Sequence, residues 1–139
     1  MAASFQLDIV TPERLAFTEE VLFVTIPGQE GTFGVLPRHA PLLSAVKPGV
    51  VQVGDEGDAV FFVVSKGYAE VLPNRVTLLV DDVIARNEIK RDEMEALRGK
   101  CSQQLVGRPP EDAEYLFLRN RVEFAEACLA LCRQEKPDR

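Results

Sequence analysis

The stretch from Thr25 to Gly49, TIPGQEGTFGVLPRHAPLLSAVKPG, restricts the fold of this chain more than any other part of it. It contains four of the nine glycines and four of the nine prolines of the 139-residue sequence. Glycine permits turns that need positive φ, whereas proline fixes φ and removes a backbone donor. A long helix is therefore excluded, and we expect tight turns joining short extended pieces. Its apolar residues should anchor those pieces to a core, leaving a rigid loop surface suited to protein contact.

The first 86 residues read as a series of short strands. Residues 5–10, FQLDIV, alternate apolar and polar side chains, which is typical of a half-buried strand. The wholly apolar run at residues 59–64 predicts a central strand covered on both faces, and GDEGD at residues 54–58 predicts the hairpin turn before it. Further strands are expected at residues 15–17, 21–26, 49–53, 68–72, 76–80 and 83–85. Eight to ten strands with frequent turns imply a β-sandwich or a flattened barrel.

Beyond Asn87 the periodicity becomes helical. Apolar residues three or four apart between residues 94 and 105 predict one helix, which Asn87 caps and Gly107 ends. Pro109-Pro110 breaks the chain, and the acidic residues at 111–114 favour the start of a second helix. That helix has two apolar stripes: Tyr115, Leu118, Val122, Ala125, Leu129 and Cys132 in one, and Phe117, Phe124, Cys128 and Leu131 in the other. One stripe can pack on the first helix. The other is covered either by the sandwich or by another subunit, and the sequence leaves both open.

The overall charge and hydropathy exclude several classes of protein. The formal net charge of −6 argues against a nucleic-acid-binding protein, whose surface would be basic. No apolar run approaches the roughly 20 residues that span a bilayer, and the N-terminal MAASFQLDIV predicts no signal peptide. Membrane association is therefore expected only through a partner.

No arrangement of residues predicts catalysis, a metal site or a cofactor. His39 is the only histidine, and PGQEGTFG lacks the lysine of a phosphate-binding loop. The cysteines Cys101, Cys128 and Cys132 are an odd set, which indicates reduced thiols in the cytoplasm. In a helical hairpin turning near Pro109, Cys101 and Cys128 would lie roughly 18 Å apart along the axis. They are better interpreted as small buried apolar residues.

Three segments of the chain are distinctive: FQLDIVTPER, PGQEGTFGVLPRHAPLLSAVKPG and SKGYAEVLPNRVTLLVDD, and the helical hairpin follows them. Together they resemble the epsilon subunit of the F1Fo ATP synthase, which is called delta in mitochondria. The resemblance implies an α+β fold in which a ten-stranded β-sandwich (residues 1–86) precedes an antiparallel two-helix hairpin (residues 87–139). It also implies a non-catalytic rotor subunit of the central stalk, on the cytoplasmic face of the membrane. Its sandwich would bind the gamma subunit and the c-ring.

The resemblance assigns roles to particular residues. It implies that the loops at Glu30-Gly31 and Arg38-His39-Ala40-Pro41 face the c-ring. It implies that basic residues of the hairpin contact the alpha and beta subunits and restrain ATP hydrolysis; here the candidates are Arg119, Arg121 and Arg133.

The family's nucleotide motif, Ile/Leu-Asp-x-x-Arg-Ala, is degenerate in this chain. In the matching segment Ile89–Met94, Lys90, Glu93 and Met94 replace the Asp, Arg and Ala of the motif, so no nucleotide binding is expected. The alternative function is a free β-sandwich adaptor whose hairpin senses a ligand.

Overall fold

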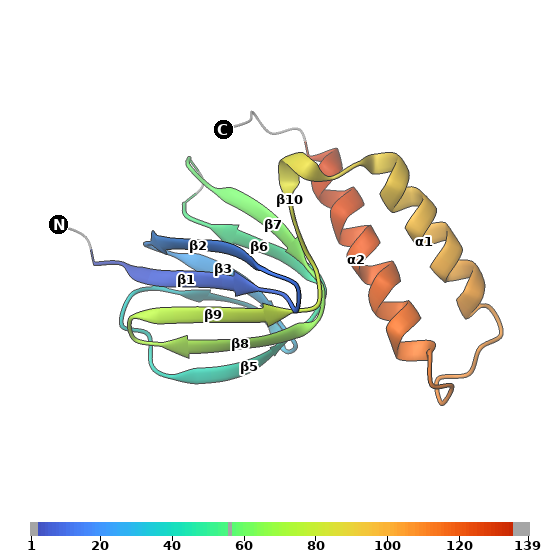
Figure 1. The fold of residues 1–139 in the computed structure, drawn as a ribbon, viewed down its shortest axis with the longest axis horizontal. Coiled ribbons are helices and arrows are strands. Elements are labelled where there is room, and N and C mark those ends of the chain that lie inside the picture. The colour runs from blue at the N-terminus through green and yellow to red at the C-terminus, as the bar shows by residue number, and fades with distance from the viewer. Residues whose placement is uncertain (1–2, 56, 135–139) are drawn as a thin grey trace.

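The computed structural model describes residues 3–55 and 57–134. Within them a β-sandwich precedes an antiparallel pair of helices, as the sequence predicted (Figure 1). The strands are β1 (Phe5–Val10), β2 (Leu15–Val21), β3 (Val24–Gly28), β4 (Gly31–Val35), β5 (Leu42–Val46), β6 (Gly49–Val53), β7 (Val60–Val64), β8 (Gly67–Leu72), β9 (Arg75–Val80) and β10 (Val83–Ala85). A 3₁₀ turn, η1 (Arg86–Glu88), leads to the helices α1 (Arg91–Leu105) and α2 (Tyr115–Arg133).

The strands follow the order β10-β7-β6-β3-β5-β8-β9-β1-β2, and β4 pairs with β3. The pairs are antiparallel except for β1 and β9, which run parallel. The sheet folds over at β3, because the start of β3 pairs with β6 at Val24 and its end pairs with β5 at Gly28. The two layers that result face each other across one apolar core.

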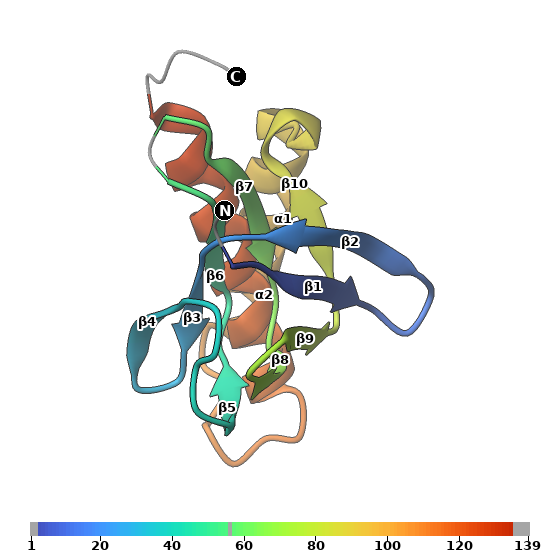
Figure 2. The same cartoon turned by 90° about the vertical axis from the view of Figure 1, so that its left-hand side faces the viewer.

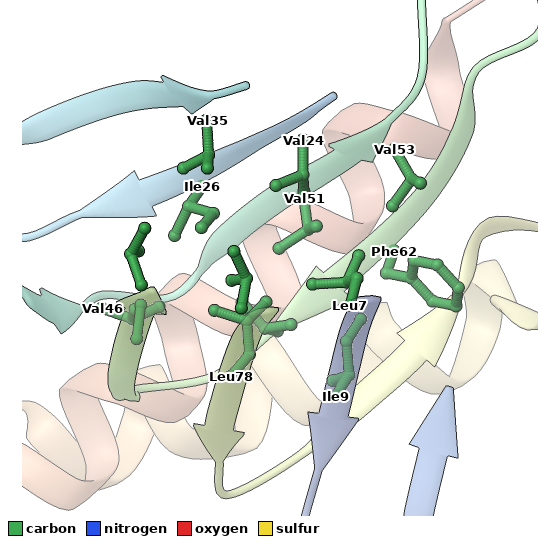
Figure 3. Packing of buried hydrophobic residues seen from close by; sticks show 14 of the residues in the cluster. Leu7, Ile9, Val24, Ile26, Val35, Val46, Val51, Val53, Phe62 and Leu78 are labelled. Atoms are coloured by element: carbon green, nitrogen blue, oxygen red, sulfur yellow. The ribbon is translucent and has the colours of Figure 1, made fainter. Parts of the chain in front are cut away.

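Side chains from both layers meet in this core, as Figure 3 shows. Leu7, Ile9 and Leu78 come from one layer, and Val24 and Val51 come from the other; all five are fully buried. The alternation in residues 5–10 therefore has the cause expected from the sequence, since Phe5, Leu7 and Ile9 all point inward.

Strand β7 is covered on both faces, which confirms the prediction from its unbroken apolar run. Phe62 and Val64 belong to the core between the two layers. Val63, fully buried, and the partly buried Phe61 belong instead to a second cluster beneath the helices. Because successive side chains of a strand point to opposite faces, only a strand buried twice needs apolar residues throughout.

Two local predictions need correction: one strand boundary and one helix cap. The strands expected at 15–17 and 21–26 are instead β2 and β3, because the polar residues 18–20 continue the pairing with β1. Asn87 does not cap the first helix. It lies in η1, and α1 begins at Arg91 with Lys90 as its N-cap residue and no side-chain cap. Gly107, by contrast, follows α1 with φ +74°, in the left-handed region expected after a helix end.

The two helices form a hairpin whose connection is held by one arginine. Arg108 donates through Nε to the Gln104 carbonyl (3.0 Å) and through Nη1 to Asp112 Oδ1 (3.1 Å). The Glu114 N–H also donates to Asp112 Oδ1 (2.8 Å). The Glu114 N–H, and secondarily Arg108, lower the pKa of Asp112 from its usual value. Helix α2 lies between the sheet and α1 (Figure 1).

Candidate interaction surfaces

The turn that carries Glu30 and Gly31 joins β3 to β4 and is held against β5. The Gln29 N–H donates to the Ala45 carbonyl (2.9 Å), and the Lys47 N–H donates to the Pro27 carbonyl (3.0 Å). Glu30 and Gly31 are exposed, and Gly31 has φ +134°, a conformation that side chains other than glycine rarely adopt. The backbone of this turn is therefore fixed while the Glu30 carboxylate faces solvent.

The loop that carries Arg38, His39, Ala40 and Pro41 joins β4 to β5. The Arg38 N–H donates to the carbonyl of Pro73, in the turn between β8 and β9 (2.8 Å), and Arg38 adopts φ +67°. His39 Nδ1 lies 2.7 Å from the Ala40 carbonyl, so Nδ1 carries the proton and donates it. His39 is half-buried, and the other three residues are exposed. This loop is also rigid, with a guanidinium on its surface.

The structure brings these six residues to one side of the sandwich but not into one cluster. The two loops lie at opposite ends of β4, beside β5 (Figure 2). Five residues of extended strand separate them by roughly 16 Å. A partner that touches both loops must therefore follow this margin of the sheet.

A third surface was not predicted from the sequence. Five apolar residues form a row across the outer face of β5, β8, β9, β1 and β2, each paired with the next; we call it the apolar row: Ala45, Tyr68, Leu79, Val10 and Leu15. Tyr68 is 58% exposed, Leu79 51% and Leu15 55%. The signal in the sequence was the pair of adjacent apolar residues at Leu78-Leu79 and Tyr68-Ala69, where alternation would require one polar residue. Contiguous exposed apolar residues indicate a contact surface.

A polar network borders the apolar row. Asp8, on β1, is 9% exposed and accepts hydrogen bonds from Thr18 Oγ1 (2.6 Å), Gln6 Nε2 (3.1 Å) and Arg75 Nη2 (3.2 Å). The hydroxyl of Thr18, followed by Gln6 and Arg75, lowers the pKa of Asp8 from its usual value against the opposing effect of burial. This network ties β1 to β2 and β9 beside the row.

The second apolar stripe of α2 is covered by the sandwich, which settles the alternative that the sequence left open for this arrangement of the chain. Phe124, Cys128 and Leu131 are buried with Val63. The partly buried residues around them come from β6, β7, β10, the linker before α1, α1 and α2 itself: Val50, Phe61, Ile84, Ile89, Met94, Leu97 and Ala127. Phe117, one end of the predicted stripe, is the exception and remains 61% exposed.

The cysteines are free thiols. Cys101 and Cys128 are buried, as predicted, and Cys132 is partly buried. Burial, and secondarily the neighbouring Cys132, raise the pKa of Cys128 to about 12. Across residues 3–55 and 57–134, no three His, Cys, Asp or Glu side chains are grouped as metal ligands. Within the same residues, no helix is long and apolar enough to cross a bilayer.

The three arginines singled out on α2 have different surroundings. Arg121 Nη1 lies 2.7 Å from Oδ2 of Asp82, in the turn between β9 and β10. Arg119 pairs with Glu123 on its own helix (3.3 Å), and Arg133 is exposed at the helix end. Within the degenerate motif Ile89–Met94, the two end residues pack into the helix–sandwich cluster and the four residues between them are exposed.

Comparison with known proteins identifies the family. Residues 4–86 match the family model described as the β-sandwich domain of the ATP synthase delta/epsilon chain. An ATP synthase epsilon chain of Magnetococcus marinus is 44% identical over 97% of this chain and 98% of the relative. That of Rhodospirillum rubrum is 36% identical over 94% and 97%.

Solved structures share the fold. A chain of the Euglena gracilis mitochondrial ATP synthase, in a structure of OSCP, F1 and the c-ring, matches with a TM-score of 0.74 and 22% identity. The match covers 94% of this chain and 82% of that one. A chain of the Tetrahymena thermophila central stalk and c-ring matches with a TM-score of 0.58 and 14% identity, covering 94% of both. Because the family match spans more than half of the chain and the relatives align almost from end to end, this chain belongs to the delta/epsilon family of ATP synthase chains, among the epsilon chains.

Proposed function

We propose that this chain is a non-catalytic rotor subunit of the ATP synthase central stalk, peripheral to the membrane. Its sandwich (residues 1–86) couples the gamma subunit to the c-ring during ion-driven ATP synthesis, and its hairpin (residues 87–139) restrains ATP hydrolysis by the alpha and beta subunits. The likeness to epsilon chains along almost the whole length carries this proposal. The fold is also found in assemblies that contain a c-ring.

The two rigid loops suit contact with the c-ring. Charged and polar side chains on a fixed backbone can form charge-assisted hydrogen bonds without first ordering the loop. Glu30 presents an anion at one end of β4, and Arg38 presents a cation at the other. Gly31, Ala40 and Pro41 add exposed backbone and apolar surface that a ring loop can approach closely.

Charge reversal tests this contact. We expect Glu30→Lys, Arg38→Glu and His39→Asp each to reduce the amount of chain retained on membranes and to lower ion-driven ATP synthesis. Asp58→Lys is the matched control, because Asp58 is exposed in a different turn, between β6 and β7. Unchanged assembly and coupling in all three variants would rule out the ring contact at these loops.

The apolar row suits the gamma subunit. A permanent partner in a rotor must bind through a surface whose core is apolar, with a polar rim. The row supplies the apolar part, and the Asp8 network lies beside it as the polar part. The Glu30 turn adjoins only the Ala45 end of the row, and the other members of the row extend away from it across β8, β9, β1 and β2, so that one sandwich can contact both partners at once.

A co-purification experiment distinguishes this function from the free adaptor. We expect the tagged full chain, expressed in its own cells, to isolate the gamma subunit, the alpha and beta subunits and membrane-bound c-ring. Recovery of the chain without gamma and without membranes would support the adaptor instead.

The restraint on hydrolysis is tested in the assembled complex. Arg119 and Arg133 are exposed, so that their replacement leaves the packing of α2 intact. If basic hairpin residues hold acidic residues of beta, Arg119→Gln together with Arg133→Gln should raise ATP hydrolysis. Identical hydrolysis rates in the parent and variant complexes would contradict that role.

A further inference from the structure

We propose that Asp82 is an internal competitor for the Arg121 guanidinium: it holds this side chain while the hairpin lies on the sandwich, and a partner carboxylate takes it when the hairpin moves away. The inference rests on the proposed function, because it names the residue that connects hairpin docking to the restraint on hydrolysis.

The position of this ion pair is its first distinguishing feature. Six ion pairs are present within the described part of the chain. Two lie inside the sandwich and three inside the hairpin, one of these within α2 alone. Among these six pairs of the described residues, only Arg121–Asp82 joins the hairpin to the sandwich. A rigid movement of the hairpin therefore breaks this pair and leaves the other five in place.

Asp82 is held ready for its partner. Its N–H donates to Oγ of Ser65 (2.7 Å), and its carbonyl accepts from the Ser65 N–H (3.0 Å). Ser65 is 4% exposed, so that this double contact fixes the backbone of the turn to the interior of the sandwich. The carboxylate is therefore presented at a fixed place with little ordering needed on binding.

Arg121 is equally constrained while the hairpin is docked. Its side chain is 27% exposed, and its guanidinium lies 5.6 Å from the centre of the Phe124 ring. Phe124 is itself buried against the sandwich. Undocking would remove both the Asp82 carboxylate and the apolar surface around Phe124. The freed guanidinium would then be available to bind another carboxylate. Arg119 has no such dependence, because its partner Glu123 moves with it on the same helix.

The far end of α2 has a second contact, which is not an ion pair. Arg86, in η1, lies 5.2 Å from the centre of the Phe61 ring and donates to the Gln134 carbonyl (3.1 Å). This contact uses a cation of the linker rather than a cation of the helix. It therefore stabilises docking without occupying a basic residue of α2 that a partner could bind. Arg121 remains the residue that can pair either with Asp82 or with a partner carboxylate.

Docking can be measured in the isolated full chain through Cys128, which is fully buried where α2 meets the sandwich. In a Cys101→Ala, Cys132→Ala background it is the single thiol, and its labelling by a maleimide reports how often the hairpin opens. We expect Asp82→Asn to raise the labelling rate about fivefold, as for loss of a partly buried pair. The matched control is Asp81→Asn, because Asp81 carries the same charge but pairs with Lys66 on the sandwich. Equal rates in Asp82→Asn and Asp81→Asn would overturn the proposal.

Hydrolysis by the assembled complex separates competition from simple docking. Asp82→Asn frees Arg121 for the partner and should lower hydrolysis, whereas Arg121→Gln opens the hairpin equally but removes the competing cation. The exchanged pair Asp82→Arg with Arg121→Asp should restore slow labelling of Cys128 and lose the restraint. Equal hydrolysis in Asp82→Asn and Arg121→Gln complexes, at different labelling from the parent, would overturn the competition. If Arg119→Gln with Arg133→Gln and Arg121→Gln both leave hydrolysis at the parent rate, the proposed restraint itself fails.

Discussion

The apolar row gives the sharpest test of the proposed contact with the gamma subunit. The perturbation is the double substitution Tyr68→Ser and Leu79→Ser, in two paired residues at the centre of the row. Both side chains are about half exposed, at 58% and 51%. Both residues directly beside them in sequence, Ala69 and Leu78, are fully buried. The substitutions therefore change the surface and leave the core as it is.

The magnitude follows from the exposed fractions. Full burial of a large apolar side chain contributes about 1.5–3 kcal/mol. Because half of each side chain is already buried within the sandwich, a partner that covers the rest gains roughly 1 kcal/mol from each. The serine hydroxyls add a desolvation cost in the same place. We expect a total loss of about 2–3 kcal/mol, which corresponds to a dissociation constant raised about 30-fold to 150-fold.

The assay is a titration of the full chain against the purified gamma subunit. Leu116→Ser is the matched control, since Leu116 is 61% exposed but lies in the first turn of α2. The control should bind like the parent, and thermal unfolding of the double variant should occur near the parent temperature, because surface substitutions usually change stability little. A double variant that binds gamma within about threefold of the parent would refute the assignment of this surface.

Three further predictions concern stability and docking. Asp8→Asn should destabilise the fold by about 1–2 kcal/mol at pH 7. Because the folded pKa of Asp8 lies below its unfolded value of 3.8, the stabilisation is present above that pH and is lost as the pH falls through the folded pKa. Urea unfolding of parent and variant should therefore differ less at pH 3 than at pH 7, and a constant difference would contradict this. Gly67→Ala should destabilise by about 3 kcal/mol or more, since an added Cβ would overlap the Leu79 carbonyl oxygen; Gly99→Ala, with open space around it in α1, should stabilise by up to ~1 kcal/mol. Phe124→Ala should weaken the docking of the hairpin on the sandwich by about 3–5 kcal/mol, because packing is lost. Hydrogen exchange should then become fast in α2 and stay slow in β1 and β9. Uniform acceleration in all elements would show that hairpin and sandwich unfold together.

The sequence predicted the fold well because its local signals agree with one another. The alternation at residues 5–10, the unbroken apolar run before Ser65 and the helical spacing after residue 90 each match what the structure shows. The misplaced boundaries have two separate causes. The polar residues 18–20 look like a loop in isolation, but they continue β2 because their backbone pairs with β1. Asn87 looks like a helix cap, but it lies in the 3₁₀ turn Arg86–Glu88, which precedes the helix.

The candidate surfaces were harder to predict because they depend on distant pairings. Arg121 was singled out as a cation, but its partner Asp82 lies 39 residues away in sequence. The apolar row joins five strands, and no single hairpin of the sequence contains more than two of its members. The turns between residues 28 and 41 could be predicted because glycine and proline mark turns directly, whereas the spacing between the two loops required β4 to be placed.

The double covering of β7 has a consequence for any chain in which the hairpin is absent or raised. The outer side of β6, β7 and β10 carries a continuous apolar patch formed by Val50, Phe61, Val63 and Ile84. Without α2 this patch is exposed to water, and soluble proteins seldom leave an apolar area of this kind exposed. A truncated chain should therefore self-associate or stick to membranes unless a neighbour in the assembled machine shelters it. Movement of the hairpin away from the sandwich therefore requires another surface to cover these apolar residues.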